Sequence, residues 1–282
     1  MSAKMDFPVL RSDFSLSTGS SRFSHLEQCI GGIKTVIIDP HNEIIPYWFK
    51  EFLRHKSSLI VVRIDAHHDM SQCCPALPAR EGREKFEFLA RLMPHLQDYC
   101  REKVNEGNFT CPGFHYGVIG ALYHFSPLEN QIDAYGRVSG SETIDAPRTA
   151  EIRDHSNARK SQRKWIVWDE ALTRLKGDSY CAKSSPVPQK LTLNDFKSDL
   201  QDCLLPIAVG FDLDGLYGND DRGPPDEVVK KRLAGVRSIL ESVARPQFIC
   251  LARSQTPRSY IPAKVVDRVQ ESALGLIKEV YD

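Results

Sequence analysis

The sequence lacks three features that would indicate a nucleic-acid-binding, membrane or secreted protein. It has no excess charge of either sign, with 37 basic and 37 acidic residues, so electrostatics favour neither nucleic acid nor an anionic membrane as partner. No apolar run approaches the roughly 18 residues that a membrane-spanning helix needs. Residues 1–14 (MSAKMDFPVLRSDF) lack the charged-then-apolar layout of a secretory signal. We therefore expect a cytoplasmic protein.

The length and the apolar pattern indicate one α/β domain over residues 1–282, with a mainly parallel sheet. Apolar runs that predict strands cover residues 34–39, 58–66, 165–169, 207–213 and 248–253. Stretches with helical periodicity cover 47–55, 84–104, 227–244 and 264–281. The segment at about 126–164 is rich in polar residues and poor in large aliphatic ones, which predicts a polar surface excursion.

Six side chains of the kinds that bind divalent cations follow three of the apolar runs. They are His41, Asp65, His67, Asp69, Asp212 and Asp214. In an extended stretch, residues two apart point to the same side, so the three ligands of VVRIDAHHDM would arrive together where a strand ends. Open parallel sheets place their sites at the carboxyl ends of strands, and the runs VGFDLDGLY and IIDPHNE end in the same way. The pattern predicts a metal-dependent hydrolase.

These runs resemble the metal-binding motifs of a known enzyme superfamily. IDAHHDMSQCCP resembles the Asp-Ala-His-x-Asp motif of the arginase and agmatinase metallohydrolases, and GFDLDGLYGNDDRGPP resembles their later Asp-x-Asp motif. IIDPHNE is similar to the element that supplies their lone histidine ligand. With EIIPYWF and NFTCPGFHYGVIGALYHF, the pattern is closest to a divergent branch that includes the peptide arginases. Those enzymes convert arginine side chains of ribosomally made precursor peptides to ornithine. The resemblance spans residues 36–262.

The resemblance implies a three-layer α/β/α fold, like that of arginases and deacetylases, with two Mn²⁺ ions per chain. Asp65 and Asp212 would bridge the ions. The remaining ligands would complete the two sites, His41 with Asp69 and His67 with Asp214. An oxygen-rich set with two imidazoles suits Mn²⁺, and two ions about 3.5–4 Å apart lower the pKa of a bound water. Asp69 would orient the resulting hydroxide toward the guanidinium carbon, and urea and ornithine would be the products.

Departures from the arginase pattern concern the substrate. Arginases that act on free arginine carry an acidic residue near the chain end that holds the guanidinium, whereas the corresponding run here, FICLARSQTPRSYIP, has no carboxylate. Met70 and Ser71 follow Asp69, without the Asn that grips the backbone of free arginine. Both absences favour an arginine-containing precursor peptide as the partner. A carboxylate is the natural bidentate partner of a guanidinium. The acids closest in sequence to the ligand motifs are Glu43, Asp220, Asp221 and Glu227, and we assign the role to Glu43, two residues past His41.

The leaving amine needs a proton donor, and histidine suits this role because its pKa lies near neutrality. His115 in FHYG resembles the His-Gly element that does this in arginases, with Tyr116 inserted before the glycine. We therefore assign His115 as the proton shuttle. His68, next to a ligand, is expected to face away from the metals.

Three other functions remain open. An arginase or agmatinase of this type could act on a free small guanidino compound. FDLDGLYG also resembles the nucleophile loop of haloacid-dehalogenase-type phosphatases, although that loop usually opens a domain and Leu216 replaces the usual Thr or Val. A deacetylase-type zinc amidohydrolase on the same fold would need only an Asp-x-His pair plus one further Asp. Two Mn²⁺, one Mg²⁺ or one Zn²⁺ per chain would separate these classes of enzyme.

Overall fold

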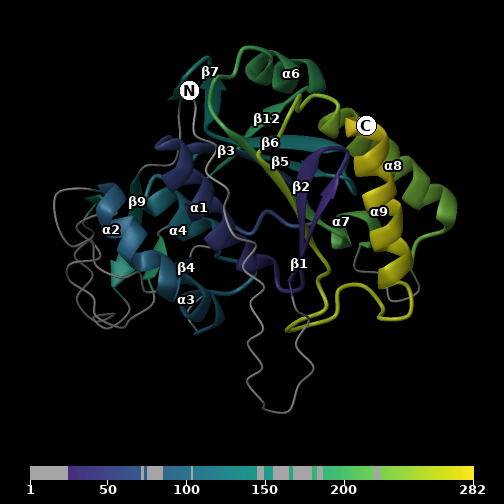
Figure 1. The fold of residues 1–282 in the computed structure, drawn as a ribbon, viewed down its shortest axis with the longest axis horizontal. Helices are drawn as coiled ribbons and strands as arrows, with labels where there is room; N and C mark the ends of the chain where they lie inside the picture. The colour runs from purple at the N-terminus through teal and green to yellow at the C-terminus, as the bar shows by residue number, and fades with distance from the viewer. Residues whose placement is uncertain are drawn as a thin grey trace, which may run out of the picture.

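The computed structural model describes residues 25–70, 73–74, 85–102, 104–144, 149–154, 165–167, 180–182, 187–218 and 223–282. Its main sheet is built from β1 (Leu26–Ile30), β2 (Ile33–Ile38), β3 (Leu59–Ile64), β5 (Ile119–Ser126), β6 (Gln131–Tyr135), β12 (Gln189–Leu191), β13 (Ile207–Asp212) and β14 (Phe248–Ala252). The strand order is β1-β2-β14-β13-β3-β5-β6-β12 (Figure 1). The strands from β2 to β5 in this order are parallel, and the pairings outside them are antiparallel. The expected α/β class with a mainly parallel sheet is confirmed.

The helices and the shorter strands connect and cover this sheet. The helices are α1 (Ile45–His55), α2 (Lys85–Leu92), α3 (Leu96–Glu102), α4 (Thr110–His115), α6 (Leu193–Gln201), α7 (Asp214–Tyr217), α8 (Asp226–Leu240) and α9 (Val266–Tyr281), with 3-10 turns η1 (His41–Ile44) and η2 (Met93–His95). Two small sheets contain β10 (Trp165–Val167), β9 (Thr149–Asp154), β11 (Tyr180–Ala182) and β4 (Cys73–Cys74), and β7 (Arg137–Ser139) and β8 (Glu142–Ile144).

Neighbouring residues of the central strands pack into two separate hydrophobic cores. On β3, Leu59 and Val61 belong to one core, and Ile60 and Val62 belong to the other. Because successive side chains of a strand point to opposite faces, the cores lie on the two faces of the sheet. Helices α1 to α4 contribute to the first core and α6 to α9 to the second. In Figure 1, α2, α3 and α4 lie to the left of the main sheet and α8 and α9 to its right. Burial on both faces explains why these strands are apolar throughout.

Most of the predicted elements are present, with three differences. Four of the five predicted strands are central strands of the main sheet, whereas the one at 165–169 is observed as β10 in a small sheet. The single helix predicted for 84–104 is divided into α2, η2 and α3 around Pro94, as expected for a residue that breaks helical hydrogen bonding. The predicted surface excursion is wrong over its first residues, because β6 pairs with β5 and is largely buried.

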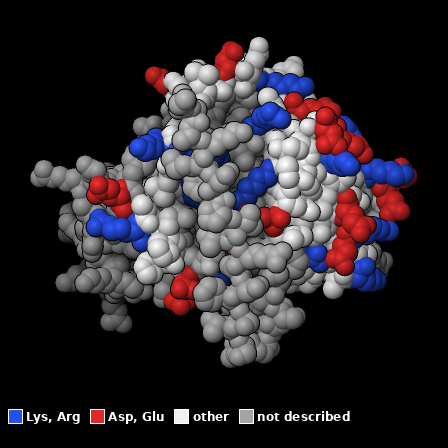
Figure 2. Space-filling view, viewed as in Figure 1, with Lys and Arg blue, Asp and Glu red and all other residues white. Residues whose placement is uncertain are grey.

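Two further observations concern the surface charge and the hydropathy of the helices. On the face shown in Figure 2, acidic and basic side chains are interspersed over the region of α8 and α9. No helix in the described part of the chain is long and apolar enough to cross a membrane.

Candidate metal centre

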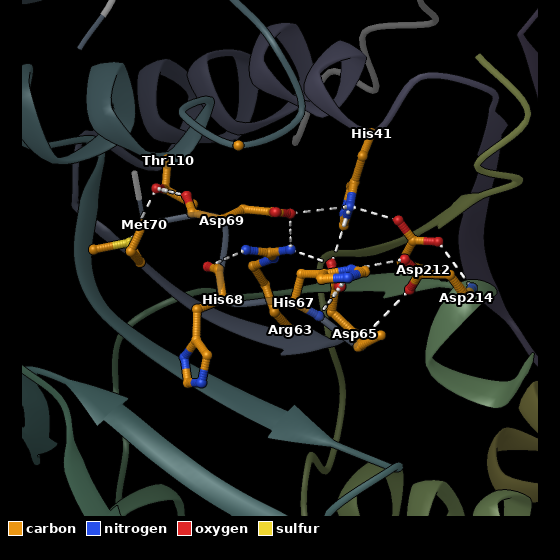
Figure 3. Close-up of polar contacts among 12 residues, drawn as sticks. His41, Arg63, Asp65, His67, His68, Asp69, Met70, Thr110, Asp212 and Asp214 are labelled. Carbon is orange, nitrogen blue, oxygen red and sulfur yellow. Dashed lines mark hydrogen bonds and ion pairs between the residues drawn. The ribbon is translucent and has the colours of Figure 1, made fainter. Parts of the chain in front are cut away.

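The six predicted ligands lie together at the carboxyl end of the central strands, and we call them the central cluster (Figure 3). His41 opens η1 after β2, and Asp212 ends β13 with Asp214 two residues further. Asp65, His67 and Asp69 follow β3. Because β2, β13 and β3 are parallel and lie within a few strands of one another, their carboxyl ends meet at one edge of the sheet. The predicted convergence of three strand ends is confirmed.

His41 lies within ion-pair distance of three carboxylates of the cluster. Its Nδ1 lies 2.9 Å from an oxygen of Asp212, 3.1 Å from one of Asp65 and 3.8 Å from one of Asp69. The ring is buried, and neither of its nitrogens has an aligned hydrogen-bond partner. Buried polar atoms are nearly always satisfied, so a nitrogen this close to several carboxylate oxygens has the geometry of a ligand that shares a cation with them.

A second group of ligands lies beside the first and shares Asp65 with it. The Nδ1 of His67 lies 3.0 Å from an oxygen of Asp214 and 3.9 Å from Oδ1 of Asp65. Asp65 contacts His41 through its other oxygen, Oδ2. The ligand atoms of His41, Asp65 and Asp212 lie within 4.8 Å of one another, and so do those of Asp65, His67 and Asp214. The carboxylate of Asp65 can therefore serve two neighbouring cations.

Backbone and side-chain donors orient the carboxylates. The hydroxyl of Ser254 donates its one hydrogen to the Asp212 carboxylate, whose two oxygens lie 2.5 and 2.6 Å from Oγ. The backbone N–H of Asp214 donates to Asp212 at 3.0 Å, and that of His67 donates to Asp65 at 2.7 Å. These bonds fix the rotamers of the carboxylates without using all their acceptor capacity.

A turn, rather than an extended stretch, gathers the three ligands that follow β3. The strand ends at Ile64, and Asp69 adopts a left-handed backbone conformation with φ 49°. Asp tolerates this conformation better than most residues do. We expected the three residues to converge because alternate residues of a continuing strand point to the same side, and this explanation is wrong. The three side chains do converge, but a turn brings them together.

Arg63 is a member of this site that the sequence analysis missed. Its side chain is fully buried on β3, and its Nη2 donates to Asp65 and, at 2.6 Å, to Asp69. Its Nη1 donates to the carbonyl of His68 at 2.8 Å, and the guanidinium lies 4.7 Å from the ring centre of Phe109. A charged residue inside the apolar run LIVVRI was the available signal, because a buried arginine needs carboxylate partners.

The crowded carboxylates perturb one another and their histidines. Burial lowers the pKa of His41, but the Asp212 and Asp65 carboxylates outweigh it and raise that pKa to about 10. Burial raises the pKa of Asp69 to about 7, against the influence of Arg63. Arg63 and His41 overcome burial and hold the pKa of Asp65 below its usual range. Protons thus compensate part of the carboxylate charge, and divalent cations could take their place.

The structure does not test the roles assigned to Glu43 and His115. Glu43 lies in η1, where its carboxylate forms an ion pair with His25; its assignment to a substrate guanidinium stays a prediction. His115 is the last residue of α4, and its side chain lies outside the described part of the chain. His68 faces away from the central cluster, as expected (Figure 3). It contacts Tyr135, His124 and Asp133 instead.

Comparison with protein-family models and with curated protein sequences found no match to this chain. The geometry of the central cluster therefore carries the functional argument.

Proposed function

We propose that this chain is a manganese-dependent hydrolase that cleaves a guanidinium group to release urea, with two Mn²⁺ ions held by the central cluster. The observation that carries the proposal is the pair of ligand groups that share Asp65. Four carboxylates and two imidazoles form an oxygen-rich set that suits Mn²⁺. The orphaned nitrogens of His41 fit this interpretation, because a cation would satisfy one of them.

When bound, the two ions would lower the pKa of a water so that hydroxide is present near neutral pH. The residues around them keep the ligands in place. Ser254 orients Asp212, and Arg63 holds one oxygen each of Asp65 and Asp69. Asp69, whose other role is to bind one ion, would accept a hydrogen bond from the attacking water and orient it.

The proposal includes a three-layer α/β/α fold of the arginase and deacetylase type. Its support is the mainly parallel sheet with a hydrophobic core on each face, and the position of the ligands at the carboxyl ends of its strands.

We place an arginine side chain within a peptide as the substrate. The segment after β14, RSQTPRSYIP, contains no Asp or Glu and so offers no carboxylate for the guanidinium of free arginine. Its Arg253 pairs with Asp267, and its Ser254 donates a hydrogen bond to Asp212. His67 marks the accessible side of the central cluster, since 39% of its side chain is exposed, and the ring of Tyr260 lies 5.7 Å from its own. A peptide could approach from this side.

Mass spectrometry of products tests the proposal. The Mn²⁺-loaded protein is incubated with a peptide that has an internal arginine and, separately, with free arginine, and ornithine is quantified in both. We expect ornithine in the peptide, none with the chelator-treated protein, and little with Asp214→Asn, which retains the shape of the side chain. Ornithine from free arginine at an equal or higher rate would move the substrate to a free guanidino compound.

Deacetylase and phosphatase assays on the same protein preparation test two other enzyme classes. A deacetylase-type amidohydrolase would use a single Zn²⁺ held by Asp65, His67 and Asp214, which form one complete group. A phosphatase would use Asp212 as nucleophile, but the hydroxyl of Ser254 donates a hydrogen bond to that carboxylate. Deacetylation with one Zn²⁺, or phosphate release with one Mg²⁺, would replace the proposal.

A further inference from the structure

A second group of potential metal ligands lies beside the central cluster and shares no residue with it. The group consists of His68, His124 and Asp133, whose ligand atoms lie within 4.8 Å of one another. We call it the lateral cluster. His124 on β5 stands directly opposite Asp133 on β6 in the antiparallel ladder, and His68 comes from the turn after β3, the neighbour of β5. Two of the three side chains are thus fixed by a rigid strand pair.

The two strand residues are buried, and their polar atoms are only partly satisfied. His124 is 0% exposed, and its ring contacts the backbone of His67 but forms no hydrogen bond to another side chain. Asp133 is 5% exposed, and its Oδ1 has no hydrogen-bond partner. A buried carboxylate oxygen left in this state costs folding free energy unless something binds it. Both face the space toward His68, whose ring centre lies 4.1 Å from that of His124.

The distance between His68 and Asp133 fits chelation better than hydrogen bonding. Nε2 of His68 lies 3.4 Å from Oδ2 of Asp133, which is longer than the 2.7–3.2 Å typical of an N–H···O bond. Two ligands bound to one tetrahedral ion at about 2.0–2.1 Å are separated by roughly 3.3 Å. On the other side of the ring, Nδ1 of His68 shares a hydrogen bond of 2.9 Å with the hydroxyl of Tyr135. A contact of this kind fixes the tautomer of a metal-binding histidine and leaves the opposite nitrogen free to coordinate.

We propose that His68, His124 and Asp133 form a mononuclear site for a transition-metal ion that favours imidazole, of which Zn²⁺ is the representative. Two imidazoles and one carboxylate form a set richer in nitrogen than the central cluster, so the lateral site should favour Zn²⁺ more strongly than the central one does. Three protein ligands leave a fourth position for water or another small ligand. His68 has 40% of its side chain exposed, so an ion can reach the site from solvent.

Occupation of this site would also act on the central cluster. His68 lies between the central ligands His67 and Asp69, and its carbonyl accepts from Arg63. An ion that holds the His68 ring to β5 and β6 would therefore restrict the turn that carries those two ligands.

Zinc binding to the full chain tests the proposal. Chelator-treated protein is titrated with Zn²⁺ against a competing chromophoric chelator, and the bound Zn²⁺ per chain is counted. We expect His124→Gln to bind one Zn²⁺ fewer than the unchanged protein. His68→Gln should lose the same ion, and because its side chain is half-exposed it decides the matter if His124→Gln fails to fold. His55→Gln is the matched control, since His55 contacts Gln247 far from both clusters in the fold, and it should bind as the unchanged protein does.

Two further variants make the result specific to this site. Tyr135→Phe retains all three ligands and should weaken the binding of this one ion by roughly 10- to 100-fold. Asp214→Asn should lose Zn²⁺ from the central cluster and keep the lateral ion, so the lateral site is measured whether or not the proposed guanidinium hydrolysis is correct. Equal Zn²⁺ content and affinity in the unchanged protein, His68→Gln and Tyr135→Phe would overturn the proposal and leave the lateral cluster as a polar part of the core.

Discussion

Replacing Arg63 by Met should strongly destabilise the metal-free protein. The side chains of Arg63 and Asp65 are 0% and 1% exposed, and Arg63 also holds Asp69. Loss of one partner of a buried ion pair leaves an uncompensated charge and costs roughly 3–5 kcal/mol. At about 2–4 °C per kcal/mol for a domain of this size, the melting temperature should fall by roughly 6–20 °C. Thermal unfolding of the chelator-treated protein, followed by circular dichroism, measures this fall.

Mn²⁺ should reverse much of that loss, because cations at the central cluster would compensate the carboxylates that Arg63 no longer neutralises. The Mn²⁺-induced rise in melting temperature should therefore be larger in Arg63→Met than in the unchanged protein. Arg237→Met is the matched control. Arg237 pairs with Glu279, and the two side chains are 39% and 64% exposed, so such a pair contributes about 0–1 kcal/mol. Equal destabilisation by the two substitutions, or an equal response to Mn²⁺ in Arg63→Met and the unchanged protein, would refute this reasoning.

Three further predictions follow from the central cluster. Asp65→Ala should remove both Mn²⁺ ions, whereas His41→Ala and His67→Ala should each remove one, as counted by elemental analysis; equal losses would contradict the sharing of Asp65. The pKa of His41 is raised from 6.5 to about 10 in the absence of metal, so its stabilising contribution is complete below about pH 6.5 and is lost as the pH rises toward 10. The melting temperature of the chelator-treated protein should fall across this window, and less steeply in His41→Gln. Ser254→Ala removes a hydrogen bond to the Asp212 carboxylate and should reduce Mn²⁺ affinity by about 10- to 100-fold, while an unchanged affinity would show that Ser254 has no part in orienting this ligand.

The central strands and the convergence of the six candidate ligands could be predicted because their signals are local. A run such as LIVVRI is buried on both faces, so it remains apolar throughout, and a ligand placed where such a run ends is recognisable in the sequence. Since parallel strands share their carboxyl edge, the convergence of His41, Asp65 and Asp212 followed from the sheet class alone.

The remaining features depend on contacts between distant residues. The β6 run QIDAY looks like surface chain because it carries Asp133, yet this carboxylate is buried opposite His124. The sequence does not show why an arginine lies within an apolar strand. In the structure, Arg63 donates a hydrogen bond to Asp69, which a left-handed backbone conformation brings close to it. Ser254 has no motif around it, and only the adjacency of β14 and β13 brings it to Asp212. In each case, the position of the residue depends on a contact with a residue that a local sequence pattern does not reveal.

Anomalous diffraction at the manganese absorption edge, from crystals of the Mn²⁺-loaded protein, tests the binuclear centre most directly. The account predicts two manganese peaks on either side of the Asp65 carboxylate, one beside His41 and Asp212 and the other beside His67 and Asp214. A single peak, or manganese bound away from Asp65, would contradict it.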